Sequence, residues 1–305
     1  MQTTSRQTPL QTSRPSRAAV SLALVLVATL FAGNFLWIRV VVHALPPLVM
    51  QAFRFVVAGA ALFAFASERS RAPRPTLAQW ARAAGAGALL VAIGQGCVSW
   101  AEQYVGAGLT VLVTSTIPMW VALLGALFFR ERVGPLALAG MAIGFAGLLP
   151  IVLASGTEAR TAGAVAALIV SSLAWALGSL YTARIVIHAD ALVATGMQLS
   201  CGGAMLAIAS IATGEAVAIR PQAFDTTIEL GIAYLTVVGG IGAYTLYVWL
   251  LHNARPAVAS MFTYLQAILG VALGALLLHE RFPPGILIGG VAVVTGVGCV
   301  VASRR

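Results

Sequence analysis

The sequence predicts an all-α integral membrane protein with ten transmembrane helices, arranged as two inverted five-helix repeats around a central cavity. Three observations support this fold class. First, 60% of the 305 residues are hydrophobic and only 9% are charged, whereas soluble domains contain about 25% charged residues. Second, the chain divides into ten long apolar runs. Third, its second half repeats a pattern of its first half. The composition excludes a soluble enzyme, a disordered scaffold and a nucleic-acid-binding domain.

Each apolar run approaches the length of about 20 residues that a transmembrane helix needs. The runs also lack the alternation of polar and apolar residues that is typical of barrel strands. The first run follows a basic segment, 1–17, but continues well past the apolar region of a secretory signal, so we expect a retained helix behind a disordered cytoplasmic tail. Breaks at charge, proline and glycine clusters place the helices near 18–41, 47–67, 77–99, 104–129, 134–154, 162–187, 191–213, 228–251, 256–278 and 284–302.

The positions of the arginines predict the orientation in the cell (inner) membrane. With the N-terminus inside, the cytoplasmic segments hold thirteen arginines and the opposite loops hold three. Cytoplasmic loops of membrane proteins carry such an excess of basic residues. Both termini are therefore predicted to be cytoplasmic, which requires an even number of spans and favours ten.

An internal repeat relates the two halves, which we place at 18–155 and 160–302. Because each half would cross the membrane five times, the second would enter the bilayer inverted. Inverted repeats are typical of transporters, with the substrate site between the two copies. A shift of 149 positions aligns Thr114 with Thr263, Gly125 with Gly274, Glu131 with Glu280, Arg132 with Arg281, Pro135 with Pro284 and Gly140 with Gly289.

Several short motifs resemble the drug/metabolite transporter superfamily, in its ten-helix EamA family. They are Gly33-Asn34-Phe35, Pro46-Pro47, Arg54, Pro118…Gly125…Glu131-Arg132 and Gly274…Glu280-Arg281. The whole chain is most similar to the bacterial YddG aromatic amino-acid exporters. The resemblance implies a central cavity lined by helices one, three, four, six, eight and nine, with five and ten peripheral. The ninth run has Ala267 where the fourth has the counterpart Pro118, so it lacks the proline that predicts a kink.

Polar and aromatic side chains recur at helical spacing along several runs. An unpartnered amide in hydrocarbon costs several kcal/mol, so the deep amides are expected to face a cavity. Helix packing is the alternative for Ser and Thr, and the membrane interface for the aromatics. Ser171 lies one residue off the sixth stripe, so its replacement should have little effect. The candidate substrate-binding residues are Asn34, Trp37, Gln95, Ser99, Ser172, Trp175, Ser179, Tyr244, Tyr247, Thr263 and Gln266.

The predicted function is export of small metabolites, above all neutral or aromatic amino acids, by alternating access. No carboxylate lies at the middle of a run, so coupling to protons is not supported. Arg54 could bind a substrate carboxylate or reach outward to Glu102 or Glu280, and we favour the second. The alternatives are a multidrug or other metabolite exporter and, from another class, a membrane-embedded enzyme.

Motifs for enzymatic or ATP-driven chemistry are not found in the sequence. We therefore expect no catalytic residue, cofactor or metal ion. The expected partners are a small-molecule substrate and the lipid bilayer, and no nucleic acid. The step from Gly140 to Gly144 permits close helix packing, either within the fold or in a homodimer.

Overall fold

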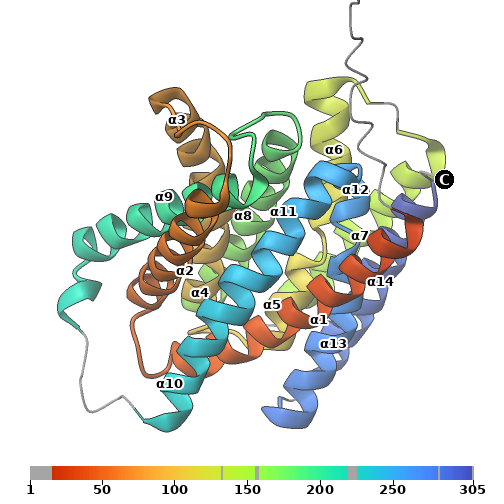
Figure 1. Ribbon diagram of the computed structural model, residues 1–305. Coiled ribbons are helices and arrows are strands. Elements are labelled where there is room, and N and C mark those ends of the chain that lie inside the picture. Colours follow the sequence, from red (N-terminus) through yellow and green to blue (C-terminus); the bar gives the residue numbers. More distant parts are fainter. Residues whose placement is uncertain (1–15, 132, 155–157, 219–224, 281, 304–305) are drawn as a thin grey trace, which may run out of the picture.

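The computed structural model describes residues 16–131, 133–154, 158–218, 225–280 and 282–303, and every regular element in those ranges is helical (Figure 1). Eight helical segments are long and apolar enough to cross a membrane, and Phe262–Leu277 and Pro284–Val300 are shorter apolar helices. A helix therefore occupies each of the ten predicted ranges. Most of the predicted tail, 1–17, lies outside the described residues, as do Arg132, Arg281 and the last two arginines.

The helices of the first half follow the predicted order, with breaks inside the third and fourth segments. They are α1 (Arg17–Val41), α2 (Pro47–Arg69), α3 (Leu77–Gly87), the π-helical η1 (Ala88–Gln95), α4 (Gly96–Ala101), α5 (Ala107–Thr114), α6 (Ile117–Phe129) and α7 (Pro135–Ala154). Thr76 and Gln79 form a reciprocal capping box at the start of α3, which satisfies backbone donors that the first helical turn leaves free.

The second half has the same organisation, including a π-helical stretch in its third segment. Its elements are α8 (Ala159–Thr182), α9 (Ala191–Ala212), the 3₁₀ turn η2 (Glu215–Val217), α10 (Thr226–Ala233), the π-helical η4 (Tyr234–Ala243), α11 (Tyr244–Asn253), α12 (Pro256–Ala259), α13 (Phe262–Leu277) and α14 (Pro284–Ala302). The side chains of Asp190 and Asp225 cap α9 and α10.

The fourth and ninth segments are both interrupted, but at different places. The fourth breaks between α5 and α6, where Ser115 and Thr116 donate their hydroxyls to Leu112 O and Val113 O, both at 2.7 Å, and where Pro118 follows. Because proline has no N–H to donate, a helix ends readily before it. The ninth has no break at Ala267, and instead breaks earlier, between α12 and α13.

Two matching turns end the fourth and ninth segments. Arg130 and His279, which are 149 positions apart, both have left-handed backbone, with φ of 53° and 52°. The following backbone N–H groups, of Glu131 and Glu280, reach back to Gly125 O and Gly274 O. The same turn therefore occurs in both halves, at the 149-residue offset that aligns their sequences.

The α7 and α14 helices pack along each other at one edge of the bundle (Figure 1). Their backbones touch at glycines: a Cβ on Gly296 would lie 2.4 Å from both Gly140 O and Gly144 N. The small-residue step predicted at Gly140 and Gly144 thus serves packing within the fold. Like α7 and α14, α2 packs against α9, with Gly59 against Ser200 N.

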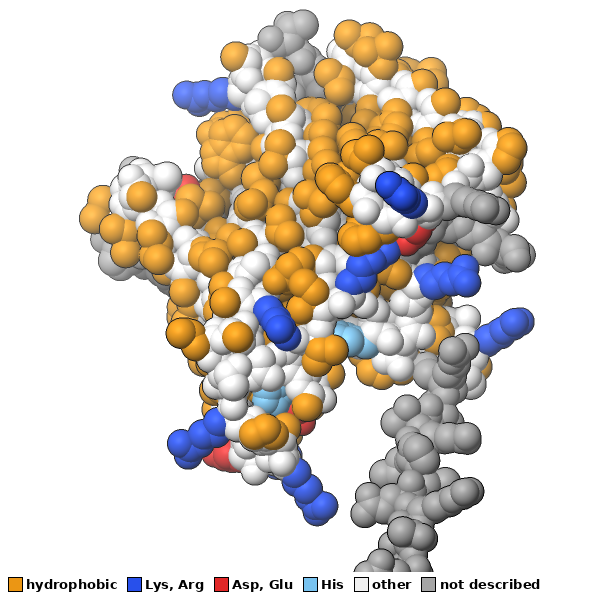
Figure 2. Space-filling model, turned by 90° about the horizontal axis from the view of Figure 1, so that it is seen from above, with side chains coloured by type: hydrophobic (Ala, Val, Ile, Leu, Met, Phe, Trp, Pro, Cys, Tyr) orange, Lys and Arg blue, Asp and Glu red, His pale blue; other side chains and the backbone are white. Residues whose placement is uncertain are grey.

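The surface carries large apolar side chains in numbers unlike a soluble protein. Figure 2 shows hydrophobic side chains over most of the visible face, with arginines projecting separately. Leu127, Leu153, Ile211 and Val291 are each about 70% exposed. Exposed apolar area on this scale marks contact with a membrane or a protein partner, which agrees with the apolar length of the helices.

Candidate functional site

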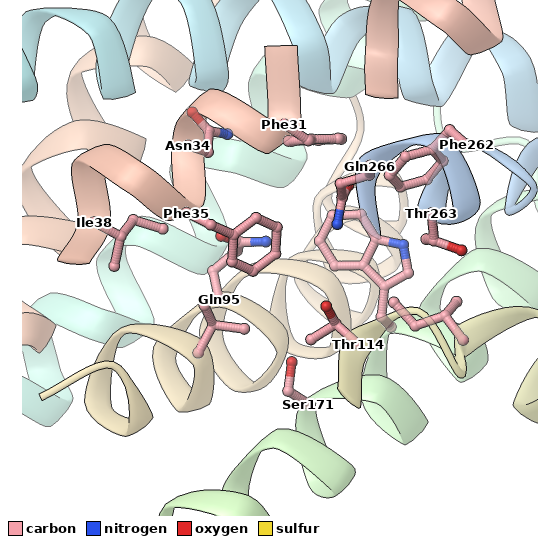
Figure 3. Close-up of a pocket in the computed structure, with 13 residues that line it drawn as sticks. Phe31, Asn34, Phe35, Ile38, Gln95, Thr114, Ser171, Phe262, Thr263 and Gln266 are labelled. Atoms are coloured by element: carbon pink, nitrogen blue, oxygen red, sulfur yellow. The ribbon is translucent and has the colours of Figure 1, made fainter. Parts of the chain in front are cut away.

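A buried cavity lies where five helical segments meet in the interior of the bundle (Figure 3). All of its lining side chains are buried, and its volume is about 30 Å³. Ligand cavities usually have about 300–1,000 Å³, so in this conformation the space suits about one water molecule. The lining residues are Phe31, Asn34, Phe35 and Ile38 from α1, Gln95 and Val98 from η1 and α4, Thr114 and Ile117 from α5 and α6, Ser171 and Trp175 from α8, and Phe262, Thr263 and Gln266 from α13.

Aromatic rings form one wall of the cavity. Phe31 packs edge-on against Trp175, with ring centroids 5.9 Å apart, and lies 5.4 Å from Phe262. Tyr247 stands behind them, 5.2 Å from Trp175 and 5.3 Å from Phe262. Offset and edge-to-face pairs at these distances are the favourable arrangements of aromatic rings, so the wall is apolar and well packed.

Hydrogen bonds hold this wall in position from outside the cavity. The Trp175 indole N–H donates to the Tyr247 hydroxyl at 2.9 Å, and that hydroxyl lies 2.6 Å from Ser179 Oγ. All three residues are buried. Because the polar end of Trp175 is bonded away from the cavity, its ring face is the part that a bound molecule would meet.

Three amides from three different helices supply the polar groups of the site. Gln95 and Gln266 extend from opposite sides toward the space between them (Figure 3). Asn34 lies against the backbone of η4, where a Cβ on Gly239 would be 2.1 Å from Asn34 Oδ1. Neither polar atom of the Asn34 amide has a hydrogen-bond partner among the described residues.

The threonine hydroxyls of the lining are already bonded within their own helices. Thr114 Oγ1 donates to Thr110 O and Thr263 Oγ1 donates to Ser260 O, both at 2.9 Å. The groups of the cavity that remain available for hydrogen bonds to a bound molecule are therefore mainly the side-chain amides.

Five of the eleven predicted residues line the cavity: Asn34, Gln95, Trp175, Thr263 and Gln266. The other six do not. Ser99 and Ser172 donate their hydroxyls to carbonyls in their own segments, and Trp37 packs on Tyr234 at 6.2 Å. Ser179 and Tyr247 support Trp175 from behind, while Tyr244 lies between Phe55 and Trp175. The eighth segment, expected to line the cavity, therefore contributes only to its outer support.

Ser171 is placed differently from the prediction. It lines the cavity, is buried, and donates its hydroxyl to Gly94 O at 2.7 Å. The predicted stripe of Ser172 and Ser179 is instead the side of α8 that bonds internally or faces Tyr247. A stripe at helical spacing identifies a face, but it does not say which neighbouring element that face meets.

Several residues that line the cavity were not predicted, although sequence patterns could have identified them. The 149-residue offset maps Thr263 and Gln266 onto Thr114 and Ile117, and both of the latter line the cavity. Phe31 and Ile38 lie one turn on either side of Asn34, on the same face of α1. No comparable signal indicates Phe262.

Arg54 does not reach outward to either predicted partner. It is 1% exposed, its guanidinium lies 4.3 Å from the centre of the Phe55 ring, and its three nitrogen atoms have no hydrogen-bond acceptor among the described residues. Glu280 is occupied elsewhere: its carboxylate accepts the N–H groups of Ala107 and Gly108, at 2.7 and 3.0 Å. The favoured structural interpretation of Arg54 as an outward ion pair is therefore wrong.

The equivalent glutamate of the first half also contacts another element. Glu131 forms an ion pair with Arg184 at 2.7 Å, which joins the end of the fourth segment to the end of α8. Both glutamates thus connect the end of one segment to another element, as expected for residues that hold helix ends together.

Comparison with known families gives one family match that covers most of the chain. The profile of the EamA-like transporter family matches residues 18–153 and again residues 162–302. The same family description therefore fits both halves of the chain.

Curated relatives carry transporter names. The chain is 32% identical over 285 residues to the "Uncharacterized inner membrane transporter YedA" of Escherichia coli K12, covering 89% of this chain and 91% of that protein. It is 30% identical to a "Probable amino-acid metabolite efflux pump" of the same strain, covering 92% and 94%. A solved structure named "Crystal structure of protein" aligns with a TM-score of 0.65 over 95% of this chain and 99% of that one, at 18% identity. At this level of sequence identity, the structural similarity shows a shared fold.

Proposed function

This chain belongs to the EamA-like transporter family, and from that premise we propose that it exports small neutral or aromatic amino acids, or metabolites of similar amphipathic chemistry, across the inner membrane. The observation that supports this proposal is the buried cavity, which has an aromatic wall and two glutamine side chains, Gln95 and Gln266, that extend toward it (Figure 3). Such a mostly apolar site with a few polar groups suits a small amphipathic molecule. The name of the E. coli efflux pump that resembles this chain supports the same substrate class.

Alternating access is the proposed mechanism. A cavity of about 30 Å³ must widen to admit an amino acid, so the described conformation is close to an occluded one. The repeated turns at Arg130 and His279 and the repeated π-helical stretches support two related halves that exchange conformations. In an inverted-repeat transporter, movement of one half against the other opens the site to alternate sides.

Both termini are proposed to be cytoplasmic, on the strength of the arginine distribution. Reporter fusions after Thr157 and after Thr226 should both read extracytoplasmic. A cytoplasmic signal at either position would refute ten spans in two inverted repeats.

Transport is proposed to follow the substrate gradient without a proton gradient. No Asp, Glu or His is among the described residues that line the cavity, and proton-driven carriers usually keep such a residue in their pathway. Efflux from preloaded liposomes should proceed equally with and without an imposed pH difference. Strict dependence on that difference would contradict the proposal.

The direct test is efflux of individual amino acids from liposomes that contain the purified protein. Gln95→Ala should weaken substrate binding by roughly ten- to a hundred-fold, since a hydrogen bond to a charged group is worth about 1.5–3 kcal/mol. Gln103→Ala is the matched control, because the Gln103 amide donates to Trp100 O at 3.2 Å and does not line the cavity. Equal efflux for wild type and Gln95→Ala would place the site elsewhere.

A multidrug or other metabolite exporter is the second candidate. A hydrophobic cation would favour an acidic group in the cavity, and the described lining has none. Efflux of an organic cation such as tetraphenylphosphonium, with no efflux of any neutral amino acid, would favour this candidate over ours.

A further inference from the structure

A broad apolar groove opens on the surface of the helical bundle. It has a volume of about 720 Å³ and is lined by residues of α1, α2, α9, η4 and α11. Figure 1 shows α1 and α2 diverging from the loop that joins them, with α11 between them. The groove is separate from the buried cavity described above, because the two share no lining residue.

The walls of this groove are almost entirely apolar. Leu22 is 60% exposed, Leu26 43% and Phe65 51%, and Thr245 is the single hydroxyl-bearing residue among the described residues that line it. Water would find few hydrogen-bond partners in such a space. Exposed apolar area of this kind marks contact with lipid or with another protein, and a membrane supplies hydrocarbon to fill it.

The length of the groove matches one leaflet of a bilayer. Along α1 its lining extends from Ala19 to Leu30, eleven positions apart, which is roughly 16 Å at the rise of an α-helix. The hydrocarbon core of a bilayer is about 30 Å thick, so the acyl chains of one leaflet span about half of that distance. An acyl chain that lies along α1 therefore fits the groove from end to end.

The end of the groove where α1 begins and α2 ends carries positive charge. Arg69 is the last residue of α2, and its guanidinium lies 3.8 Å from the centre of the Phe65 ring, which lines the groove. Arg17, the first residue of α1, is exposed two positions before Ala19. Trp249 lines the groove from the last turns of α11, and tryptophan is enriched at the level of the lipid headgroups.

Two carboxylates stand near the groove in the sequence, and both are directed to other contacts. Glu68 lines a different hollow, together with His188. Asp190 caps α9 by accepting two backbone N–H groups. Among the described residues, neither Arg17 nor Arg69 forms an ion pair with a carboxylate. The positive charge at this end of the groove is therefore available to an anionic group.

We propose that this groove binds one anionic phospholipid, with an acyl chain along α1 and the phosphate at Arg69. A planar guanidinium is well suited to phosphate oxygens. A zwitterionic phospholipid also carries a phosphate, but its ammonium group offsets the charge. Under the orientation proposed above, the lipid belongs to the cytoplasmic leaflet. Lipid binding here does not depend on which substrate the protein transports.

The test measures lipid binding to the purified, delipidated protein by native mass spectrometry. The protein is titrated with phosphatidylglycerol or with phosphatidylcholine that has the same acyl chains. Wild type should retain one phosphatidylglycerol, bound roughly five-fold more tightly than phosphatidylcholine, because one arginine near an anionic lipid contributes about that factor. Equal affinities for the two lipids would overturn the proposal without any variant.

A charge variant tests the position of the headgroup. Arg69→Gln should lose the roughly five-fold preference and leave the affinity for phosphatidylcholine unchanged. Arg74→Gln is the matched control, because Arg74 is an exposed arginine after α2 that lines the same hollow as Glu68 and not the groove. It should bind both lipids like wild type. An unchanged preference in Arg69→Gln would overturn the proposal, because the headgroup would then be held elsewhere.

A second variant tests the position of the acyl chain. Leu26→Trp places a larger side chain in the groove and should weaken both lipids roughly ten-fold, the effect of losing the burial of about two methylene groups. Leu127→Trp, at a 69% exposed position on α6, is the control and should bind lipid like wild type.

Two results of this second experiment would also overturn the proposal. Wild-type lipid affinity in Leu26→Trp would place the lipid outside the groove. A protein dimer that excludes lipid, and that Leu26→Trp dissociates, would assign the groove to a second copy of this chain. The wild-type comparison of the two lipids remains decisive if a variant fails to elute as a folded species in detergent.

Discussion

Two adjacent serines of α8 allow one substitution to test the placement of the site. Ser171 donates its hydroxyl across to Gly94 O of η1, at 2.7 Å, and lines the cavity. Ser172 donates to Leu168 O, four residues earlier in its own helix, at 2.9 Å. Ser171→Ala and Ser172→Ala remove the same hydroxyl from neighbouring buried positions. The two variants differ only in what that hydroxyl contacts.

The two substitutions are expected to change the free energy of unfolding by different amounts and in different directions. Hydrogen bonds between helices in membrane proteins contribute on average about 0.6 kcal/mol and at most about 1.7 kcal/mol, so Ser171→Ala should lower the free energy of unfolding by about 0.6–1.7 kcal/mol. A serine bonded to the carbonyl four residues back slightly destabilises a helix, and alanine has the higher helix propensity. Ser172→Ala should therefore leave the stability unchanged or raise it by a few tenths of a kcal/mol.

Unfolding in mixed micelles with increasing SDS fraction measures this difference, with helicity and tryptophan fluorescence as signals. Efflux assays on the same preparations should show reduced transport for Ser171→Ala and normal transport for Ser172→Ala. If Ser172→Ala were the more damaging variant in both assays, the face of α8 that meets the cavity would be the one carrying Ser172, and the sequence-based stripe would be the better guide.

Three further predictions test helix ends and packing. Glu280→Ala, which removes the acceptor of two N–H groups at the start of α5, should cost about 1.5–3 kcal/mol of unfolding free energy, while Glu158→Ala, where no side-chain cap bond exists, should cost almost nothing. Burial raises the pKa of the Glu215 carboxyl above its usual range, so the folded state binds this proton more readily than the unfolded state. Glu215→Gln should then be more stable than wild type at pH 7, with the difference closing as the pH falls through that raised pKa; identical pH profiles in thermal unfolding would contradict this. Gly296→Ala should lower the yield of monodisperse protein, because its Cβ would meet backbone at 2.4 Å, whereas Gly298→Ala, with nothing within 4 Å, should not.

The class of protein and the positions of its helices follow from the sequence alone. Long apolar runs separated by charged residues predict membrane helices. In hydrocarbon the backbone N–H and C=O groups must find hydrogen-bond partners within the protein, and a helix provides them within the same segment. Because this requirement applies within each segment, each helix can be predicted from its own apolar run. The offset that pairs Glu131 with Glu280 likewise recurs as matching turns at Arg130 and His279.

The deep amides were predictable for a related reason. Their cost in hydrocarbon is so large that Gln95, Gln266 and Asn34 had to turn inward, and all three line the cavity. Serine, threonine and aromatic residues carry a smaller penalty, and they are equally stable in packed interfaces. Sequence reasoning therefore counted Tyr244 and Ser172 among the candidate binding residues, although neither lines the cavity in this structure.

What the sequence by itself determined is which groups must avoid lipid, and what the tertiary structure decided is which groups meet. Arg54 shows the difference most clearly: its charge and its depth along α2 are evident from the sequence, but its separation from both Glu102 and Glu280 is not. Glu280 instead accepts N–H groups at the start of α5, and Arg39 donates to the backbone carbonyl oxygen of Glu102. Contacts between elements distant in the chain arise from the packing of the whole bundle, and no local pattern of residues specifies them.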